Sequence, residues 1–333
     1  MRDILPTLRR WRVDGIRFAT ATVVHTWGSS PRPIGSVMGI NVQGSVVGSV
    51  SGGCVETAVI DAAQQALELG TAHLVDFGEL TDESVWEVGL SCGGRIGVWI
   101  EPDPYESDAW VECTDWVDQD EPCALIQDYG GQRYWAWNAD RPCPPELPAE
   151  VWIQCAEAVV ARRSRGFGDG YFILALPRKE RLIIVGAVHI AIPLVAMAKA
   201  IGVEAIVVDP RPVLADPSRF ATTPDQMIAV WPHDALSYLS PNESDYAVVL
   251  THDPKIDDAA LKILLKSPVR YIGALGSRTT QEKRRKVLAE LGFSEEEIGR
   301  IHGPVGLPIG ARSPEEIAVS IIAQIVQVRN ADL

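Results

Sequence analysis

Short apolar segments alternate with helical patterns from residue 182 to the end of the chain. Segments that are apolar along their whole length fit strands buried on both faces, as in a parallel sheet that helices cover on both sides. The alternation therefore predicts a doubly wound parallel sheet of the α/β class in this half of the chain. The expected strands are Leu182–Val185, Ala205–Val208, Tyr246–Leu250 and Tyr271–Gly273.

The stretch from Leu182 to Ala198 also raises a membrane alternative, because it is almost wholly apolar and approaches the ~18 residues that a membrane-spanning helix needs. Gly186, His189 and Pro193 interrupt it. A strand, a glycine turn and a buried helix explain these three residues better than one continuous helix does. We therefore expect no membrane partner.

The length of 333 residues exceeds what one hydrophobic core usually organises, so we expect two domains. The sequence favours a boundary after residue 178, which gives domains 1–178 and 179–333. The first domain mixes strands and helices in an α+β arrangement. Its expected strands lie within 17–26, 36–50 and 171–176, and its expected helices within 55–69 and 150–163.

The formal net charge of −14 disfavours a nucleic-acid partner, because a polyphosphate backbone would be repelled. Residues 1–11 contain no continuous apolar core of a signal peptide, so we expect a cytoplasmic location. Residues 101–121 carry nine acidic side chains and no Lys or Arg. We interpret this segment as a solvated acidic surface, with docking of a basic partner as the alternative.

Six cysteines occur, at positions 54, 92, 113, 123, 143 and 155. They form no C-x-x-C pair and accompany no histidine cluster, which disfavours a zinc site. Disulfides are also disfavoured in a cytosolic protein. Each cysteine is therefore expected to be a buried, small apolar residue unless its position argues otherwise.

Cys54 and Cys92 are the two exceptions that the sequence favours, because a glycine pair adjoins each of them. The pairs are Gly52-Gly53 before Cys54 and Gly93-Gly94 after Cys92. Glycine is costly to order, so repeated glycine beside a cysteine predicts backbone amides close to a bound group. Buried, inert thiols are the alternative, and the two matching contexts favour a function.

The surroundings of both thiols should also favour the thiolate form. Cys54 stands where a helix is predicted to start, and the positive end of the helix dipole should lower the pKa of its thiol. Arg95 offers Cys92 a nearby cation. A thiolate ligates soft metals or attacks sulfur, so we select both cysteines as candidate contacts to a soft metal or to sulfur.

The second domain resembles a dinucleotide-binding fold in its spacing, because Asp209 ends the second strand about 20 residues after Gly186. The glycine fingerprint is broken, since Val188 replaces the glycine that lets the backbone approach a pyrophosphate. Pro193 would also kink the following helix. We therefore disfavour tight NAD(P) binding in this Rossmann-like domain.

Other residues at the strand ends still suit an anionic ligand. We select His189, Asp209 and Asp253 at the expected crevice, and Ser277 with Arg278 at a helix start that suits a phosphate. Helix capping or turn chemistry is the alternative for the two aspartates. The last helix is predicted to start with a capping box formed by Ser313 and Glu316.

Taken together, these motifs resemble the XdhC/CoxI family of accessory proteins for molybdenum hydroxylases. In the first domain the resemblance rests on residues 28–33, 48–56, 92–94 and 101–102, and in the second on 186–189, 251–253, 272–278 and 306–318. This chain departs from the family pattern at Val188, Ala191, Pro254 and Pro308. The departures all lie in the second domain and bear on its phosphate contacts more than on the cysteines.

The resemblance implies a non-catalytic maturation chaperone. Such a protein binds molybdenum cofactor (molybdopterin), assists its sulfuration and passes it to an apo form of a xanthine dehydrogenase or CO dehydrogenase-type hydroxylase. It also implies a homodimer, and a cysteine desulfurase as a second partner. An NAD(P)-dependent oxidoreductase and a thiol-based sulfur-transfer enzyme are the alternatives.

Overall fold

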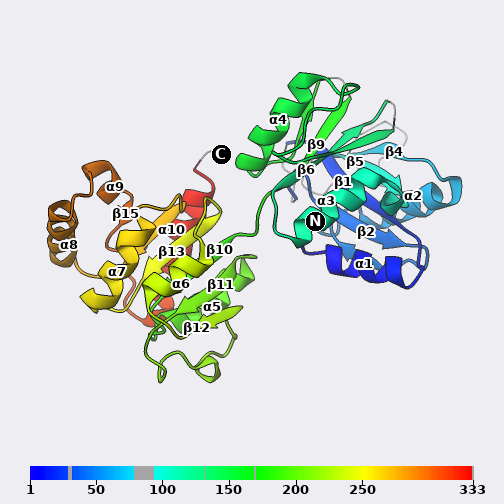
Figure 1. The fold of residues 1–333 in the computed structure, drawn as a ribbon. Helices are drawn as coiled ribbons and strands as arrows, with labels where there is room; N and C mark the ends of the chain where they lie inside the picture. The colour runs from blue at the N-terminus through cyan, green and yellow to red at the C-terminus, as the bar shows by residue number, and fades with distance from the viewer. Residues whose placement is uncertain (29–31, 79–93, 131, 169, 332–333) are drawn as a thin grey trace. The chain divides into compact units, whose positions relative to one another are not determined.

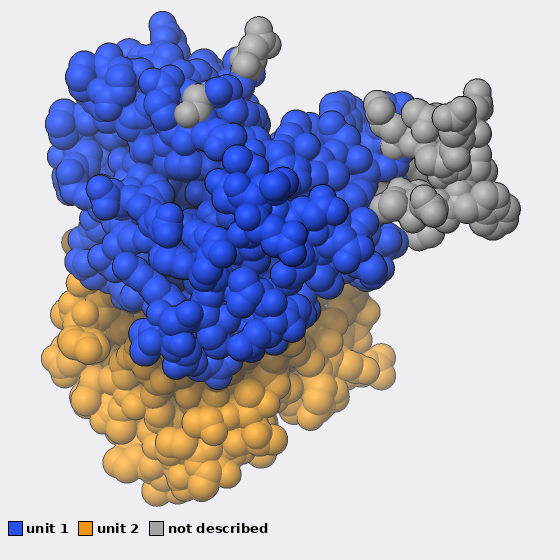
Figure 2. Space-filling view, turned by 90° about the vertical axis from the view of Figure 1, so that its right-hand side faces the viewer, with its two compact units in different colours: residues 1–178 blue, residues 179–333 orange. Residues whose placement is uncertain are grey.

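The computed structural model describes residues 1–28, 32–78, 94–130, 132–168 and 170–331. The chain divides into two compact units, Met1–Arg178 and Lys179–Leu333 (Figures 1 and 2). In the described residues, no helix is both long enough and apolar enough to cross a membrane. The apolar stretch after Leu182 instead forms a strand, a turn and a helix, as we predicted.

The first unit contains a five-stranded antiparallel sheet, which we call sheet A, in the order β3-β2-β1-β5-β4 (Figure 1). Helix α2 packs on one face through Val59, Ala63 and Leu67, against apolar side chains of β1, β2 and β5. Gly70 ends α2 in the left-handed conformation. The elements are β1 Phe18–Trp27, β2 Val37–Asn41, β3 Val46–Gly48, α2 Glu56–Leu69, β4 His73–Phe77 and β5 Arg95–Pro102.

A second antiparallel sheet of the first unit, sheet B, has the order β7-β6-β9-β8. A core that includes Phe18, Trp99, Trp110 and Leu125 joins the two sheets to α1 and α3. Helix α4 packs on sheet B through a separate core that includes Val151. The elements are α1 Leu5–Val13, α3 Asp108–Asp118, β6 Cys123–Asp128, β7 Arg133–Trp137, α4 Ala149–Val160, β8 Arg165–Phe167 and β9 Tyr171–Leu176.

The second unit is a six-stranded parallel sheet in the order β12-β11-β10-β13-β14-β15, which confirms the predicted doubly wound fold. One core lies under α5 and α10, and another lies on the opposite face under α6 and α7. The strands are β10 Arg181–Val185, β11 Glu204–Val208, β12 Gln226–Ile228, β13 Asp245–Val249, β14 Tyr271–Ala274 and β15 Ile301–His302. The helices are α5 Ala191–Ala200, α6 Pro232–Leu239, α7 Pro254–Leu264, α8 Arg278–Glu290, α9 Glu295–Gly299 and α10 Pro314–Arg329.

The predicted capping box of the last helix is confirmed. The Ser313 side chain accepts from the Glu316 amide, and the Glu316 carboxylate accepts from the amide of Ser313. Ile321 and Ile325 of this helix are buried in the core. Strands β12 and β15 were not predicted, because segments of three and two residues carry too little pattern to identify.

The acidic segment 101–121 is less solvated than we predicted. Glu101 is buried, at 4% exposed. Arginines from outside the segment pair with many of its other carboxylates, and the pairs are Arg2–Asp120, Arg9–Asp115, Arg9–Asp118, Arg17–Asp103 and Arg141–Glu112. The segment is therefore partly neutralised within its own unit, which weakens the alternative of a basic docking partner.

Candidate functional site

The topology of sheet A gathers the glycine-rich loops of the sequence at one end of the sheet. Strand β1 finishes at Trp27, opposite the first residue of β5, Arg95. Strands β3 and β4 run in the same direction as β1 and finish at Gly48 and Phe77. The chain therefore leaves the sheet at this end after Trp27, Gly48 and Phe77, and it enters the sheet again here at Val37 and Arg95.

The loop before α2 is organised around the carboxylate of Glu56. This carboxylate accepts hydrogen bonds from the hydroxyl of Ser49 (2.6 Å), the amide and hydroxyl of Ser51, and the amide of Gly53 (2.8 Å). Burial opposes the charge, but these hydrogen bonds outweigh it and lower the pKa of Glu56 to about 2. Glu56 thus occupies the positive end of the α2 dipole.

The amides that we expected beside a bound group have hydrogen-bond partners within the loop itself. The amides of Ser51 and Gly53 donate to Glu56, and the amides of Gly52 and Cys54 donate to serine hydroxyls. Gly52 and Gly53 adopt φ of +76° and +119°, and side chains there would meet open space. These two glycines are therefore explained by backbone conformation, not by a bound group in close contact. Their contact with a cofactor stays a prediction.

Cys54 is exposed, in contrast with the other cysteines of the described residues. Cys113, Cys123 and Cys155 are buried, as the default interpretation predicted, and Cys143 is half-buried. Burial raises the pKa of the Cys155 thiol to about 12. Cys54 precedes Val55, the N-cap of α2, so its thiol stands beside the organised loop and faces solvent.

The second glycine and cysteine motif lies only partly within the described residues. Cys92 and Gly93 lie outside them. Gly94 is buried, and a side chain at Gly78 would lie 2.5 Å from the Gly94 carbonyl oxygen, so the chain crosses itself closely where it leaves β4 and enters β5. Arg95 follows and is exposed.

Sequence reasoning missed a His–Asp pair at the same end of sheet A. His25 Nε2 lies 2.7 Å from Asp76 Oδ1, and the ring centroids of His25 and Trp27 are 4.2 Å apart. A side chain at Gly97 would overlap the His25 ring, so this glycine makes room for it. His25 and Asp76 are 51 residues apart in sequence, and no local pattern could have joined them.

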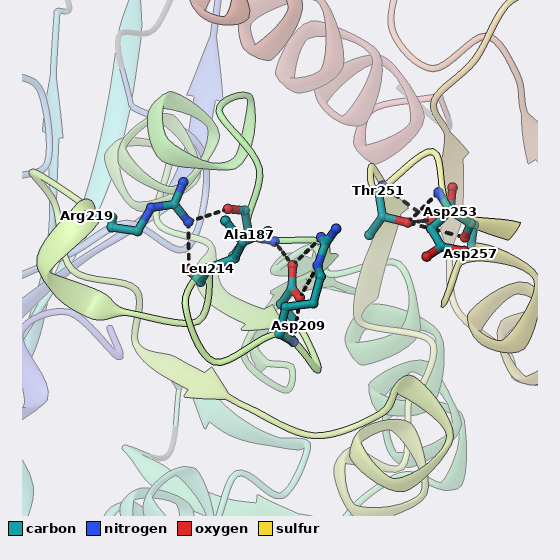
Figure 3. A network of polar contacts seen from close by, with 8 residues as sticks. Ala187, Asp209, Leu214, Arg219, Thr251, Asp253 and Asp257 are labelled. Atoms are coloured by element: carbon teal, nitrogen blue, oxygen red, sulfur yellow. Dashed lines mark hydrogen bonds and ion pairs between the residues drawn. The ribbon is translucent and has the colours of Figure 1, made fainter. Parts of the chain in front are cut away.

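In the second unit, Asp209 does not contact a ligand space. It is fully buried at the end of β11, and its carboxylate accepts from the Ala187 amide (2.8 Å) and from the amide and guanidinium of Arg211. Burial opposes ionisation, but the hydrogen bonds from Arg211 and Ala187 lower the pKa of Asp209. Figure 3 shows Asp209 beside Ala187, with Arg219 donating to the carbonyls of Ala187 and Leu214.

The capping alternative holds for Asp253, and Ser277 is a helix cap as well. Asp253 caps α7 by accepting from the Lys255 amide, and Ser277 caps α8 by accepting from the Thr280 amide. Arg278 is the exposed first residue of α8. These residues remain candidates for a phosphate contact, but each aspartate or serine already has a structural role.

A buried aspartate, Asp257, was not among the predicted residues. It accepts from the amide and hydroxyl of Thr251 (Figure 3), and its other oxygen lies 3.6 Å from the guanidinium of Arg284. Burial raises the pKa of Asp257 although Thr251 and Arg284 oppose that effect. This network fixes the start of the loop that carries His252.

The cleft of the second unit lies at the carboxyl edge of its sheet. It has a volume of about 300 Å³ and is lined by residues that follow β10, β13 and β14 and by the start of α10. His189, one of the predicted residues, lines it together with His252, from the loop that carries the predicted Asp253, and Arg312, which was not among the predicted site residues. Gly186 precedes the first residues of the cleft lining. Glycine is needed there, because φ is +113° and a side chain would lie 2.7 Å from the Thr251 methyl carbon.

No group of three or more His, Cys, Asp or Glu side chains that could hold a metal ion occurs in the part of the chain that the structure describes. A metal ion held by the described residues would therefore need further ligands that these residues do not supply. A metal that arrives within an organic cofactor already carries such ligands, and a single exposed thiol can add to them.

Two family models match the chain. The model for the XdhC and CoxI family matches residues 11–78, and the model for the XdhC Rossmann domain matches residues 182–325. The second match agrees with the predicted Rossmann-like domain.

Related proteins are similar over nearly the whole chain. A probable xanthine dehydrogenase subunit of Bacillus subtilis is 30% identical over 313 residues, which cover 93% of this chain and 92% of that protein. The molybdenum cofactor insertion chaperone PaoD of Escherichia coli is 27% identical, over 92% of this chain and 82% of its own length. A crystal structure described as a xanthine dehydrogenase from Bacillus halodurans superposes with a TM-score of 0.76 at 27% identity, covering 99% of this chain and 96% of that one.

Proposed function

This chain belongs to the XdhC and CoxI family, and on that premise we propose that it serves the maturation of a molybdenum enzyme, by binding molybdenum cofactor as cargo. The likeness to PaoD, a molybdenum cofactor insertion chaperone, supports this general role. Our finer proposal is that the cofactor is held at the end of sheet A, that its sulfuration is assisted there with sulfur from a cysteine desulfurase, and that it is then passed to an apo-hydroxylase. We propose a cytoplasmic homodimer as the working form.

The observation that carries this proposal is the exposure of Cys54 on a loop that Glu56 holds in one conformation. A thiol that is preorganised and open to solvent can reach a bound group without a cost in loop ordering. The buried thiols of Cys113, Cys123 and Cys155 cannot do so.

The residues at this end of the sheet fit the chemistry of the cargo. The cofactor supplies a soft metal–sulfur centre and a phosphate when it is bound. A cysteine sulfur is the side-chain ligand that suits such a centre, and the exposed guanidinium of Arg95 at the start of β5 suits an anion. Cys54 would be the principal contact and Cys92 the second.

The geometry does not favour an NAD(P)-dependent oxidoreductase. In such an enzyme, Asp209 would bind the ribose hydroxyls of the dinucleotide. Its two oxygens instead accept four hydrogen bonds from Ala187 and Arg211. A ribose would have to displace an internal ion pair from a fully buried position.

The test is the molybdenum and pterin content of the full chain, purified anaerobically after co-expression with cofactor synthesis. We expect the wild type to retain both, and Cys54→Ser to lose most of both while keeping its melting temperature. Cys143→Ser is the matched control, because Cys143 is only half-buried and lies on another part of the unit. Equal molybdenum content in the Cys54→Ser variant and the wild type would reject the proposed contact.

A further inference from the structure

We propose that the cleft of the second unit binds the phosphate group of a small phosphate monoester with a flat apolar ring, and that a dinucleotide is not its ligand. This site is separate from the proposed cofactor contact at Cys54 and does not depend on it. The proposal rests on the position of the cleft, on the side chains that line it, and on the internal hydrogen bonds that occupy the β11 side of the sheet, where a dinucleotide would bind.

The strand order puts the cleft where the sheet reverses its direction of growth. The chain builds β10, β11 and β12 toward one edge, and then returns to place β13 on the other side of β10. In open α/β sheets the loops at such a point diverge and leave a crevice at the carboxyl ends of the strands. The cleft of about 300 Å³ occupies this position and is at the small end of ligand sites.

The polar side chains that line the cleft are one arginine and two histidines, all of which can donate hydrogen bonds to an anion. His189, His252 and Arg312 come from three separate segments, and no carboxylate is among the lining residues of this cleft in the described chain. Glu315, in the exposed first turn of α10, lies outside the lining but interacts electrostatically with His189. The lining therefore selects an anion.

Within the described residues, the first turn of α5 adds no free N–H group to this site. Residues 188–190 line the cleft and lead into α5, a helix of ten residues. The amides of Ala191 and Ile192 donate to the carbonyls of Val188 and His189, and Pro193 has no N–H group. The preference for an anion therefore comes from the side chains that line the cleft.

The apolar lining and the residues around the cleft indicate which group is attached to the phosphate. Leu250, Leu275 and Ile317 offer an apolar surface that suits a flat ring. On the β11 side, where a dinucleotide would place its adenosine, Asp209 is paired with Arg211, and Arg219 ties the turn after β10 to Leu214. The ligand is therefore confined to the side of β13 and β14.

The proposal is tested by calorimetric titration of the full chain, purified without molybdenum cofactor. The probes are phenyl phosphate, phenol, inorganic phosphate and NAD⁺. We expect phenyl phosphate to bind roughly tenfold or more tightly than phenol, because charge-assisted hydrogen bonds to the phosphate are lost with phenol. Inorganic phosphate should bind more weakly than phenyl phosphate. NAD⁺ should bind no more tightly than phenyl phosphate does.

Variants locate the binding. Arg312→Gln and His189→Gln should each weaken phenyl phosphate binding about tenfold, whereas Glu315→Gln should strengthen it severalfold by removing a nearby negative charge. Lys286→Gln is the matched control, because Lys286 is an exposed cation of α8 that does not line the cleft. Cys54→Ser should bind phenyl phosphate as tightly as the wild type does. This result therefore stays independent of whether Cys54 contacts the molybdenum cofactor.

Three results would overturn the inference. The first is no binding of phenyl phosphate, or binding that neither Arg312→Gln nor His189→Gln weakens. The second is inorganic phosphate that binds as tightly as phenyl phosphate, which would assign the cleft to free phosphate. The third is NAD⁺ that binds more tightly than phenyl phosphate and depends on Asp209.

Discussion

Glu101 should make the first unit less stable as the pH rises toward 8. It is buried at the end of β5 among Gln127 of β6 and Tyr134 of β7. Burial raises the pKa of Glu101 from 4.5 to about 8, although hydrogen bonds with Tyr134 and Gln127 oppose this effect. At neutral pH the buried side chain is therefore a neutral carboxylic acid.

The sign of the pH dependence follows from where the proton is held. Between pH 4.5 and 8 the folded state keeps a proton on Glu101 that the unfolded state has released, so the free energy of unfolding falls as the pH rises. The slope is at most ~1.4 kcal/mol per pH unit, which amounts to at most about 5 kcal/mol over the interval. Glu101→Gln removes this contribution because glutamine does not titrate.

The assay is urea denaturation at several pH values from 5 to 9, followed by tryptophan fluorescence. Nine of the ten tryptophans lie in residues 1–178, so the signal reports mainly on the first unit. We expect Glu101→Gln to be no more stable than the wild type at pH 5 and more stable by roughly 2–4 kcal/mol at pH 8. Glu106→Gln, which changes an exposed carboxylate of the same segment, should shift stability by less than about 0.5 kcal/mol at either pH. Parallel pH profiles for the wild type and Glu101→Gln would refute the reasoning.

Two further predictions concern the supports of the two sites. Gly186→Ala should lower the stability of the second unit by roughly 2–4 kcal/mol, because φ is +113° and the new methyl group would press on Thr251. Calorimetry should show a smaller loss for Gly202→Ala, where φ is unfavourable but the space is open. Equal melting temperatures for the two variants would contradict this prediction. Burial opposes the charge of Glu56, but the hydrogen bonds from its loop hold its pKa at about 2, so its stabilisation is present above pH 4.5 and is lost as the pH falls toward 2. Glu56→Gln should therefore flatten the acid-unfolding profile measured by circular dichroism, and an unchanged profile would show that the loop does not depend on this charge.

The second unit was predicted well because its strands and helices are marked by unbroken apolar runs. The first unit was predicted less completely. Helix α3 buries Trp110, Cys113, Thr114 and Val117 at helical spacing, but the acidic residues between them hid that pattern in the sequence. Strands β6 and β7 were missed as well. They pair with each other, and β6 also pairs with β9, which lies far away in the chain.

At the sites, the exposure of Cys54 was anticipated from its position, and its surroundings were not. The local sequence contained Glu56 but did not reveal that this carboxylate collects the amides that we had assigned to a ligand. An aspartate that binds a ribose and one that binds Arg211 also look the same in a sequence, because both follow a buried strand. The partners of His25 and His189 come from distant segments, which only the fold brings together.

The most direct measurement of the central claim is X-ray absorption at the molybdenum edge on the anaerobically purified, cofactor-loaded protein. If Cys54 contacts the metal, the wild type should show one more sulfur neighbour at molybdenum than Cys54→Ser that has been loaded with the same cofactor in excess. Cys143→Ser should match the wild type. Identical molybdenum spectra for the wild type and Cys54→Ser at equal metal content would contradict a cofactor held by this thiol.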